Sequence, residues 1–397
     1  MTRPMQSSPR SVLVALCCVA ICLYSLYLGA VGVLLPYLGE AFTLGAEAQG
    51  RLFPANFLGF VVGVLLCGYL SDRWGRKAVL LIGLAVYAVG LLLFGAAQLY
   101  PLALAAALLV GAGSGAMEVV VSALAADLFP EKRAFVINAL QVAFGAGAAV
   151  APTLCRYLLT HGTDWRSLYL GLAGINLAVF FVFAACRIPR TATHESLEVS
   201  ALREAVKSPA FGTLCLMQAL YVGGEVSFFS WLPTYFQKQL PGGALWTGIV
   251  GTVFWLAMTL GRFLLGGVLG RFPLMKLCAI SAGGGVVFSA LALVGRSPVF
   301  VLVGVALTGL FFSGIFTLIL AETGERFPHV SGTAFGGVVA AGGLGGAVVP
   351  WAVGALADGG LGWRGALGLV PACLLGALLL SRRLAPRTGV SPAESPG

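Results

Sequence analysis

The sequence predicts an all-α membrane protein in which twelve transmembrane helices form two six-helix bundles related by pseudo-symmetry. Three observations lead to this prediction. First, 59% of the 397 residues are hydrophobic and 10% are charged, whereas a soluble domain carries about 25% charged residues. Second, apolar segments of roughly 20 residues, the length that spans a bilayer, recur about twelve times. Third, motifs of the first half return in the second half. The composition excludes a soluble enzyme, a secreted disulfide scaffold and a disordered chain.

The expected helices follow one another along the chain with short polar or glycine- and proline-containing turns between them. The first apolar segment could be a signal peptide, since Arg3 and Arg10 precede it. It is too long for the apolar region of such a peptide, and no clear cleavage site follows it, so we interpret it as the first spanning helix. The approximate ranges of the twelve helices are 11–37, 47–70, 77–98, 101–125, 134–159, 167–186, 210–236, 244–266, 276–295, 299–321, 332–356 and 363–381.

An even number of helices places both termini on the same side of the membrane. When Lys and Arg are assigned to alternate loops, 18 of the 24 fall on the side of the termini and 6 on the other side. Cytoplasmic loops carry the excess of positive charge in membrane proteins. We therefore expect a multi-pass protein of a bacterial-type inner (plasma) membrane, with both termini in the cytoplasm.

The longest polar stretch lies in the middle of the chain, on the expected cytoplasmic side. Within it, Val199, Leu202 and Val206 share one helical face, which predicts a short amphipathic helix on the membrane surface. This stretch divides the chain into an N-terminal six-helix bundle (1–186), a cytoplasmic linker (187–209) and a C-terminal six-helix bundle (210–397).

Several motifs recur at a constant spacing of 198 residues. Phe129-Pro130 returns as Phe327-Pro328, Pro152 as Pro350, and Trp165-Arg166 as Trp363-Arg364. Matches at one shift indicate two parallel halves related by an axis along the membrane normal. In transporters of this design the solute site lies between the halves near the bilayer midplane, and the halves rock around it.

Glycines occur at helical spacing inside the apolar segments. Gly59 with Gly63, and Gly111 with Gly115, each form a G-x-x-x-G pair. Small residues at this spacing let two helix backbones approach closely. The run from Gly111 to Ala116 also resembles a dinucleotide-binding fingerprint, but no strand precedes it, so we expect helix packing there.

Residues 68–77 (GYLSDRWGRK) lie between the second and third expected helices. They match G-x-L-x-D-R-x-G-R-K, and this run resembles the cytoplasmic signature of the major facilitator superfamily. The glycines permit a tight turn, and Asp72 can pair with cations or with the positive end of a helix. The candidate gating residues are Gly68, Asp72, Arg73, Gly75, Arg76 and Lys77.

These residues predict a latch that forms on one side of the membrane and breaks as the halves rock. The corresponding run of the second half has Arg271 where the acid should be, so we expect the latch in the first half alone. A positive-inside anchor is the simpler interpretation. It accounts for the basic residues but leaves Asp72 and the glycines unexplained.

Two acidic residues lie inside apolar helices: Glu118 in the fourth and Glu225 near the middle of the seventh. An ionisable group within the membrane is costly and by default marks a functional site. A carboxyl group in apolar surroundings can hold a proton near neutral pH. We therefore predict Glu118 and Glu225 as proton-coupling residues; each could instead form a structural hydrogen bond between helices.

Polar and aromatic residues on nearby helices are candidates for binding a solute. Asparagine and glutamine share one face of the fifth helix, and three polar residues follow one stripe of the seventh. Amides can bond to sugar hydroxyls, and rings can stack on the C–H faces of a sugar; packing or an interfacial belt is the alternative for the aromatic residues. The candidate substrate-binding residues are Asn138, Gln141, Gln218, Tyr221, Glu225, Trp231 and Trp255.

The run from Gln218 to Glu225, continuing to Trp231 and Tyr235, resembles helix seven of the fucose–galactose–glucose proton symporters, the family of fucose permease. Positions of helices four, five and eight of that family are matched by Glu118, by Asn138 and Gln141, and by Gly261-Arg262-Phe263. The resemblance implies a sugar or sugar-like solute and, in much of the family, proton coupling.

One departure from that family concerns helix one. Fucose permease has an acid just before its Leu-Leu-Pro, whereas here Gly32 precedes the run from Val33 to Pro36, and no acid is expected in helix one. Proton coupling, if present, would then fall to Glu118 or Glu225.

We expect a secondary transporter that moves a small polar solute by alternating access, with a sugar or sugar-like molecule as first choice and protons as the candidate coupling ion. The alternatives are a proton-coupled exporter of drugs or amphiphiles, for which Ala151-Pro152 is a weak match to an antiporter signature, an organic-acid transporter, and a membrane-embedded enzyme or receptor. No nucleophile–base pair supports an enzyme.

Few further partners are expected. The nine cysteines lack zinc-ligand spacing, and the basic residues form no stripe interleaved with aromatic residues. We expect no metal, no cofactor and no nucleic acid, and a monomer in the lipid bilayer.

Overall fold

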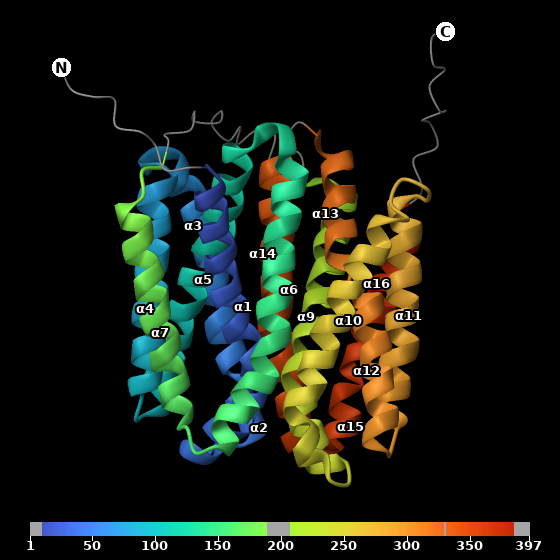
Figure 1. Ribbon diagram of the computed structural model, residues 1–397. Helices are drawn as coiled ribbons and strands as arrows, with labels where there is room; N and C mark the ends of the chain where they lie inside the picture. Colours follow the sequence, from blue (N-terminus) through green and yellow to red (C-terminus); the bar gives the residue numbers. More distant parts are fainter. Residues whose placement is uncertain (1–9, 189–206, 329–330, 385–397) are drawn as a thin grey trace, which may run out of the picture.

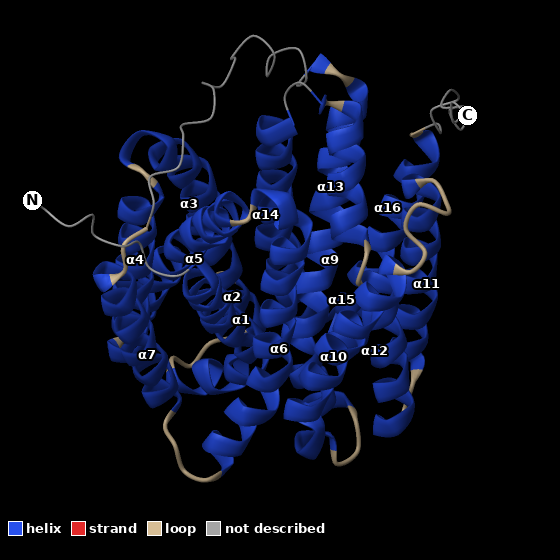
Figure 2. Ribbon diagram, turned by 45° about the horizontal axis from the view of Figure 1, so that its top comes forward, coloured by secondary structure: helices blue, strands red, loops and turns tan. Residues whose placement is uncertain are grey.

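The computed structural model describes residues 10–188, 207–328 and 331–384, and all regular secondary structure in these ranges is helical. Figure 1 shows long helices standing side by side, and Figure 2 shows that the loops between them are short. Ten of the spans built from these helices are long and apolar enough to cross a membrane. These ten spans, together with α9 (Pro209–Gln239) and α16 (Leu369–Arg383), correspond to the twelve transmembrane helices expected from the sequence. The predicted all-α, twelve-helix fold is therefore confirmed.

The first half of the chain forms α1 (Arg10–Ala41), α2 (Ala46–Gly50), α3 (Leu52–Trp74), α4 (Arg76–Ala96), α5 (Tyr100–Leu128), η1 (Pro130–Lys132), α6 (Arg133–Thr160) and α7 (Trp165–Ala185). The second half adds to α9 and α16 the elements η2 (Gly243–Trp246), α10 (Thr247–Gly266), α11 (Leu274–Val294), α12 (Pro298–Phe312), α13 (Ile315–Arg326), α14 (Ser331–Leu356), η4 (Ala357–Leu361) and α15 (Gly362–Leu367).

The described chain begins and ends at the same end of the molecule (Figure 1). We call this the proximal end, and we call the opposite end, where α2 and α15 lie, the distal end. The predicted amphipathic helix around Val199 lies outside the described residues. The domain boundaries in this linker therefore stay a prediction.

Three helices that the sequence analysis expects to be continuous are interrupted. The breaks lie at Arg51, at Ser313-Gly314 and at Gly368. At the second break the Ser313 hydroxyl donates a hydrogen bond to the Leu310 carbonyl oxygen (2.7 Å). Side chains of this type compete with the helical backbone, and the glycine that follows is a poor helix former.

The first helix is longer than expected. α1 continues to Ala41 with Pro36 inside it, because helix-breaking residues are tolerated where neighbouring helices satisfy the freed backbone groups. Glu40 therefore belongs to α1. The expectation that helix one carries no acid is wrong.

Close packing of α3 on α5 confirms the interpretation of the G-x-x-x-G pairs. A Cβ atom added to any of these four glycines would overlap backbone atoms of the partner helix. The backbone atoms concerned belong to Asn56, Phe60, Leu108 and Ala112.

The repeat of 198 residues is visible in matching hydrogen bonds. The Arg166 guanidinium donates to the Ala97 carbonyl oxygen (3.3 Å), and the Arg364 guanidinium donates to the Gly295 carbonyl oxygen (3.0 Å). Donors and acceptors are each 198 positions apart. The two halves therefore use the same tie between corresponding helices.

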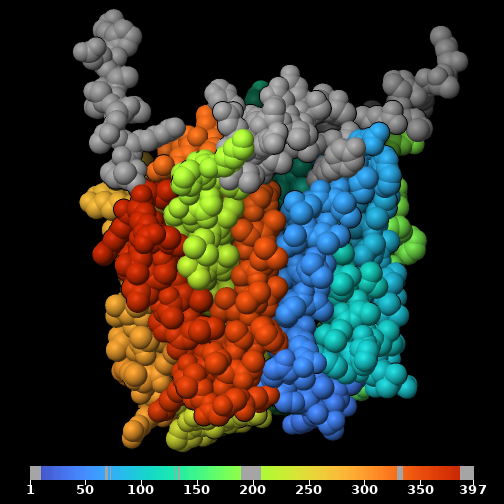
Figure 3. Space-filling view, turned by 180° about the vertical axis from the view of Figure 1, so that it is seen from behind, coloured from blue at the N-terminus to red at the C-terminus, as the bar shows by residue number. Residues whose placement is uncertain are grey.

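Long helices of the two bundles meet where α1 packs on α9, α3 on α14 and α6 on α10, and the short α2 also packs on α14. Figure 3 shows α14 lying along α3 at the back of the molecule. An added Cβ atom on Gly32 of α1 would lie 2.7 Å from the Ser230 carbonyl oxygen of α9, and one on Gly251 of α10 would lie 2.8 Å from Pro152 of α6. All four residues lie between mid-helix and the distal end.

A polar network joins the bundles at the distal end itself. The Asp358 carboxylate accepts a hydrogen bond from the backbone N–H of Glu47 (2.8 Å), and the Trp351 indole N–H donates to the Glu47 carboxylate (2.9 Å). Because Glu47 belongs to the first bundle and its two partners to the second, these bonds hold the bundles together at the distal end.

Candidate functional site

Four helices bring ionisable side chains to the middle of the molecule. The charge of Arg262 acts on both Glu118 and Glu225, and both carboxyl groups lie within electrostatic range of Tyr24. Tyr24 and Glu118 come from α1 and α5 in the first bundle, whereas Glu225 and Arg262 come from α9 and α10 in the second. We call these four residues the central cluster. The cluster spans the boundary between the halves.

Glu118 lies on α5 and is half-buried. It forms no hydrogen bond or ion pair with any residue that the structure describes. A carboxyl group without a partner inside the membrane is free to bind a proton, a cation or a solute.

Glu225 lies on α9 one turn after Tyr221, and the two side chains are neighbours. Tyr221 is fully buried, and its hydroxyl donates a hydrogen bond to the Phe312 carbonyl oxygen (3.0 Å). Phe312 is the last residue of α12, so this hydroxyl caps a carbonyl at the break between α12 and α13. This hydrogen bond holds the Tyr221 side chain in place beside Glu225.

Arg262 lies four residues before the end of α10 and is half-buried. Its Nε atom is buried without a hydrogen-bond partner, and no ion pair joins its guanidinium to the residues described. The sequence analysis matched Arg262 to helix eight of the fucose–galactose–glucose proton symporters but did not count it among the site residues. A signal was available, because a basic residue inside an apolar helix marks a functional position.

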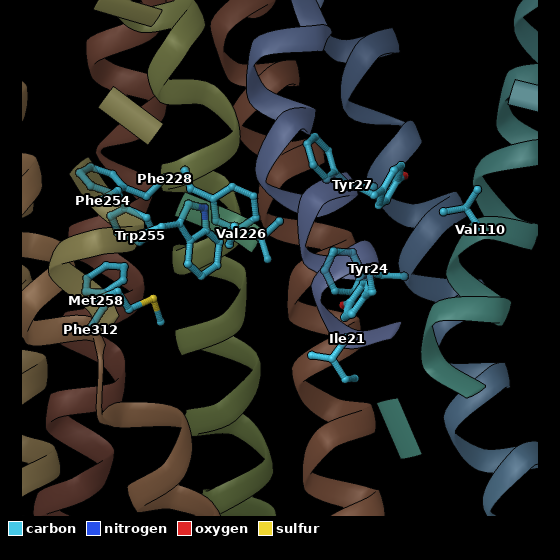
Figure 4. Packing of buried hydrophobic residues seen from close by; sticks show 14 of the residues in the cluster. Ile21, Tyr24, Tyr27, Val110, Val226, Phe228, Phe254, Trp255, Met258 and Phe312 are labelled. Carbon is cyan, nitrogen blue, oxygen red and sulfur yellow. The ribbon is translucent and has the colours of Figure 1, made fainter. Parts of the chain in front are cut away.

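Four aromatic rings connect the bundles beside the central cluster. Ring centroids are 5.8 Å apart for Tyr24 and Phe144, 5.7 Å for Phe144 and Trp255, and 5.1 Å for Trp255 and Phe229. We call this set the aromatic bridge; Figure 4 shows Tyr24 on α1 and Trp255 on α10 at a similar height. Trp255 precedes Arg262 by seven residues and so lies two turns nearer the distal end. Its indole N–H is buried and finds no partner among the described residues.

The amides of α6 lie on the face that this helix turns toward α10. A Cβ atom on Gly145 would lie 2.5 Å from Thr259 Oγ1 of α10. Gln141 and Asn138 precede Gly145 by four and seven residues, so they continue the same face toward the proximal end. Gln141 is half-buried and Asn138 is exposed.

Two other predicted binding residues lie in helix packing. Gln218 is fully buried against Gly342 of α14, and neither polar atom of its amide has a partner. The Trp231 indole N–H donates to the Pro350 carbonyl oxygen (2.9 Å), and its ring lies 5.1 Å from that of Trp363. The structure therefore groups Glu118, Glu225, Tyr221 and Trp255 of the predicted set and separates Gln218 and Trp231 from them.

The predicted gating residues lie at the proximal end, where Gly68, Asp72 and Arg73 fall on the last turns of α3. Gly75 has a φ of 87° between α3 and α4, which is the conformation that the expected tight turn requires. The Arg76 guanidinium pairs with the Asp127 carboxylate of α5 (3.2 Å).

Lys77 ties the same segment to α7. Its ammonium donates to the carbonyl oxygens of Ala184 (2.7 Å) and Cys186 (2.6 Å). The position 198 residues after Arg76 is Leu274, so this basic residue is not repeated in the second half.

A polar cavity of about 250 Å³ lies between the bundles on the distal side of the aromatic bridge. The Arg156 guanidinium donates to the Tyr37 hydroxyl inside it (3.1 Å). Sequence reasoning missed this cavity, because Glu40 was placed beyond the first helix. Its polar lining residues are Tyr37, Glu40, Arg156, Gln237 and Thr247.

Comparison with known proteins agrees with this architecture. The family model described as Major Facilitator Superfamily matches residues 17–295. The chain belongs to the major facilitator superfamily, and it is therefore an integral, multi-pass membrane protein and a secondary transporter, not an enzyme.

Two curated relatives match most of the chain. The cis,cis-muconate transport protein of Acinetobacter baylyi is 26% identical over 337 residues, which cover 80% of this chain and 81% of the relative. The glucose/mannose transporter GlcP of Bacillus subtilis is 24% identical over 337 residues, which cover 81% and 82%.

Among solved structures, the fucose:proton symporter FucP of E. coli in its outward conformation matches with a TM-score of 0.68 and 21% identity, over 94% of this chain and 99% of that chain. The resemblance to fucose permease inferred from the sequence is thus supported at the level of the fold.

Proposed function

We propose that the protein is a proton-coupled transporter of a small polar solute, a sugar or sugar-like molecule, which binds between the two bundles. The central cluster carries this proposal. It places one carboxyl group on each bundle, Glu118 and Glu225, with Arg262 within electrostatic range of both. Groups that belong to different halves change their separation when the halves rock, so their protonation is coupled to the conformational change.

Glu118 is the first candidate for the coupling proton. It has no partner among the described residues, whereas Glu225 lies beside Tyr221. A carboxyl group that is neutral when it crosses the low-dielectric interior avoids the cost of moving a bare charge. Protonation of Glu118 would therefore permit the return step of the cycle.

The aromatic bridge and the α6 amides favour a sugar-like solute. Trp255, Phe229 and Tyr24 offer apolar ring faces, and Gln141 and Asn138 offer amide donors and acceptors. The similarity to the glucose/mannose transporter GlcP supports this solute class. An organic acid is the second candidate, since the cis,cis-muconate transport protein is also similar.

We propose further that both termini lie in the cytoplasm of a bacterial-type inner membrane and that the protein works as a monomer. The excess of Lys and Arg on the proximal side supports this orientation.

The Glu118→Gln variant tests proton coupling. Glutamine resembles the protonated acid in size and hydrogen-bonding capacity, so uphill, pH-driven uptake into proteoliposomes should be abolished while counterflow exchange of the solute survives. Glu131→Gln is the matched control, because Glu131 follows the same helix and is exposed; it should keep both activities.

Two other outcomes would contradict this assignment. Wild-type pumping in the Glu118→Gln protein would exclude Glu118 as the proton carrier. A joint loss of pumping and counterflow would indicate that Glu118 binds the solute as a carboxylate, because a hydrogen bond to a charged group contributes about ten- to a hundredfold in affinity.

A further inference from the structure

We infer that Arg262 binds a carboxylate group of the solute, so that the transported molecule is a hydroxylated carboxylic acid of the size of a sugar, such as a sugar acid. This inference rests on the proposed function and specifies the solute class for the same site.

The first argument is that Arg262 has no hydrogen-bond or ion-pair partner among the residues that the structure describes. A guanidinium carries five N–H donors and stays charged at every physiological pH. Neither Glu118 nor Glu225 lies within 4.0 Å of it, although both are within electrostatic range. A buried charge needs a hydrogen-bonded partner of opposite sign. An anion that enters from outside can supply this partner.

The second argument is the kind of unpaired atoms that surround the site. Arg262 Nε and Trp255 Nε1 are both buried without partners in the described ranges of the chain, and both are donors without acceptor capacity. A solute that satisfies them must present acceptors at two places. A carboxylate fits the forked guanidinium best, and a hydroxyl oxygen fits the single indole N–H.

The two donors lie on one face of α10, two turns apart. Trp255 and Arg262 are seven residues apart on α10, which is two turns, so they share one face and their Cα atoms are separated by about 10 Å along the helix. The ring of Trp255 and its neighbours in the aromatic bridge lie at the distal end of this span. A six-carbon acid can place its carboxylate on Arg262 and its C–H face against Trp255.

The charges of the cluster connect this binding to protons. The titratable groups that face Arg262 are Glu118 of α5 and Glu225 and Tyr221 of α9. With both glutamates ionised the site carries a net negative charge and repels an anion. When both are protonated Arg262 is left as the uncompensated charge and attracts one. Anion and proton therefore enter together.

Matched pairs of probes that differ in the carboxylate test the inference. D-glucuronate and D-gluconate should bind purified protein, measured by calorimetry and thermal shift, at least tenfold more tightly than D-glucose. Arg262→Gln should weaken binding of the acids about ten- to a hundredfold. Arg262→Lys keeps the positive charge but loses the forked geometry of the guanidinium, so its affinity for the acids should lie between those of the wild type and Arg262→Gln.

Arg271→Gln is the matched control, because Arg271 is an exposed arginine just after the same helix; it should bind the acids as the wild type does. If Arg262→Gln does not fold, the comparison of acid with neutral sugar in the wild type and in Arg262→Lys decides the question.

The two proposals fail in different ways. Binding and transport of D-glucose that persist unchanged in Arg262→Gln would overturn the inference and leave the proposed function intact. Preferential binding of cis,cis-muconate or of an amphiphile would overturn the hydroxylated-acid assignment. Arg262-dependent binding of D-glucuronate without any flux into proteoliposomes would support the inference and contradict the proposed function.

Discussion

Tyr221 shows how one side chain can serve both the stability of a bundle and the geometry of the site. Its hydroxyl caps the Phe312 carbonyl at the end of α12 (3.0 Å), and its side chain neighbours that of Glu225. The ring is also packed edge-on against the Phe312 ring, with centroids 5.9 Å apart. Replacement of Tyr221 by phenylalanine therefore removes this hydrogen bond and keeps the ring that packs on Phe312.

Tyr221→Phe should lower the free energy of unfolding by about 1 kcal/mol, because it leaves a buried carbonyl at a helix end unpaired. Thermal unfolding in detergent or lipid nanodiscs measures the change. Tyr157→Phe is the control, since Tyr157 is exposed on α6, and its transition temperature should not move. Equal transition temperatures for Tyr221→Phe and the wild type would show that the Phe312 carbonyl finds another donor.

The sequence identifies some site residues and misses others for physical reasons. Glu118 and Glu225 stand out because acids are rare in apolar helices, and the structure places both in the central cluster. Arg262 was hidden by its place near a helix end, where snorkelling arginines are common. Gln218 shares the stripe of Glu225, and Trp231 follows it on the same helix, yet the two pack against α14 and α15. Helical periodicity defines a face but does not tell which neighbour that face meets.

At the scale of the helices, the pairing of α6 with α10 depends on the absence of side chains. A Cβ atom on Gly248 would lie 2.8 Å from Arg156 Cβ and 3.0 Å from the Pro152 carbonyl oxygen. Both contacts cross from one bundle to the other. They exist only while the bundles are closed at the distal end, so a larger residue at this position penalises one conformation of the transporter.

Gly248→Val should shift the population toward molecules that are open at the distal end. Spin labels at His161 and Pro241, two exposed positions on opposite bundles, would report a longer distance in a cysteine-free background. Gly266→Val on the same helix is the matched control, because nothing lies within 4 Å of an added Cβ atom there. An unchanged distance distribution in Gly248→Val would mean that the helices absorb the side chain without separating.

The helix boundaries were predicted better than the helix breaks. Long apolar runs with Gly or Pro between them delimit α4, α5 and α11 almost as expected, because a spanning segment needs a fixed length. The break at Ser313-Gly314 depends on a hydrogen bond to Leu310 and on the Tyr221 cap. Such tertiary contacts leave no periodic trace in the sequence.

At the scale of the whole molecule, the two halves are alike in construction and different at the proximal end. The ties made by Arg166 and Arg364 repeat at 198 residues, whereas Arg76, which pairs with Asp127, is replaced by Leu274 in the second half. This asymmetry supports the proposal that the gating segment acts in the first half alone. The end at which the bundles are closed could not be predicted, because one sequence specifies both conformations of an alternating-access transporter.

The distal network offers a test of the conformational equilibrium that is independent of the solute. Asp358 and Asp164 each accept a hydrogen bond from a backbone N–H at the start of a helix, from Glu47 (2.8 Å) and from Arg166 (3.0 Å). The bond of Asp164 lies within one bundle and exists in every conformation. The bond of Asp358 crosses between the bundles and exists only when the distal end is closed.

Asp358→Ala should therefore reduce the ratio of distally closed to distally open molecules about fivefold, which corresponds to the loss of about 1 kcal/mol from one state alone. Asp164→Ala loses a similar cap and should lower thermal stability without moving this ratio. The same pair of spin labels at His161 and Pro241 measures the ratio in both variants. If Asp164→Ala shifted the distance distribution as much as Asp358→Ala, the network would be a general source of stability and not a contact specific to the closed state.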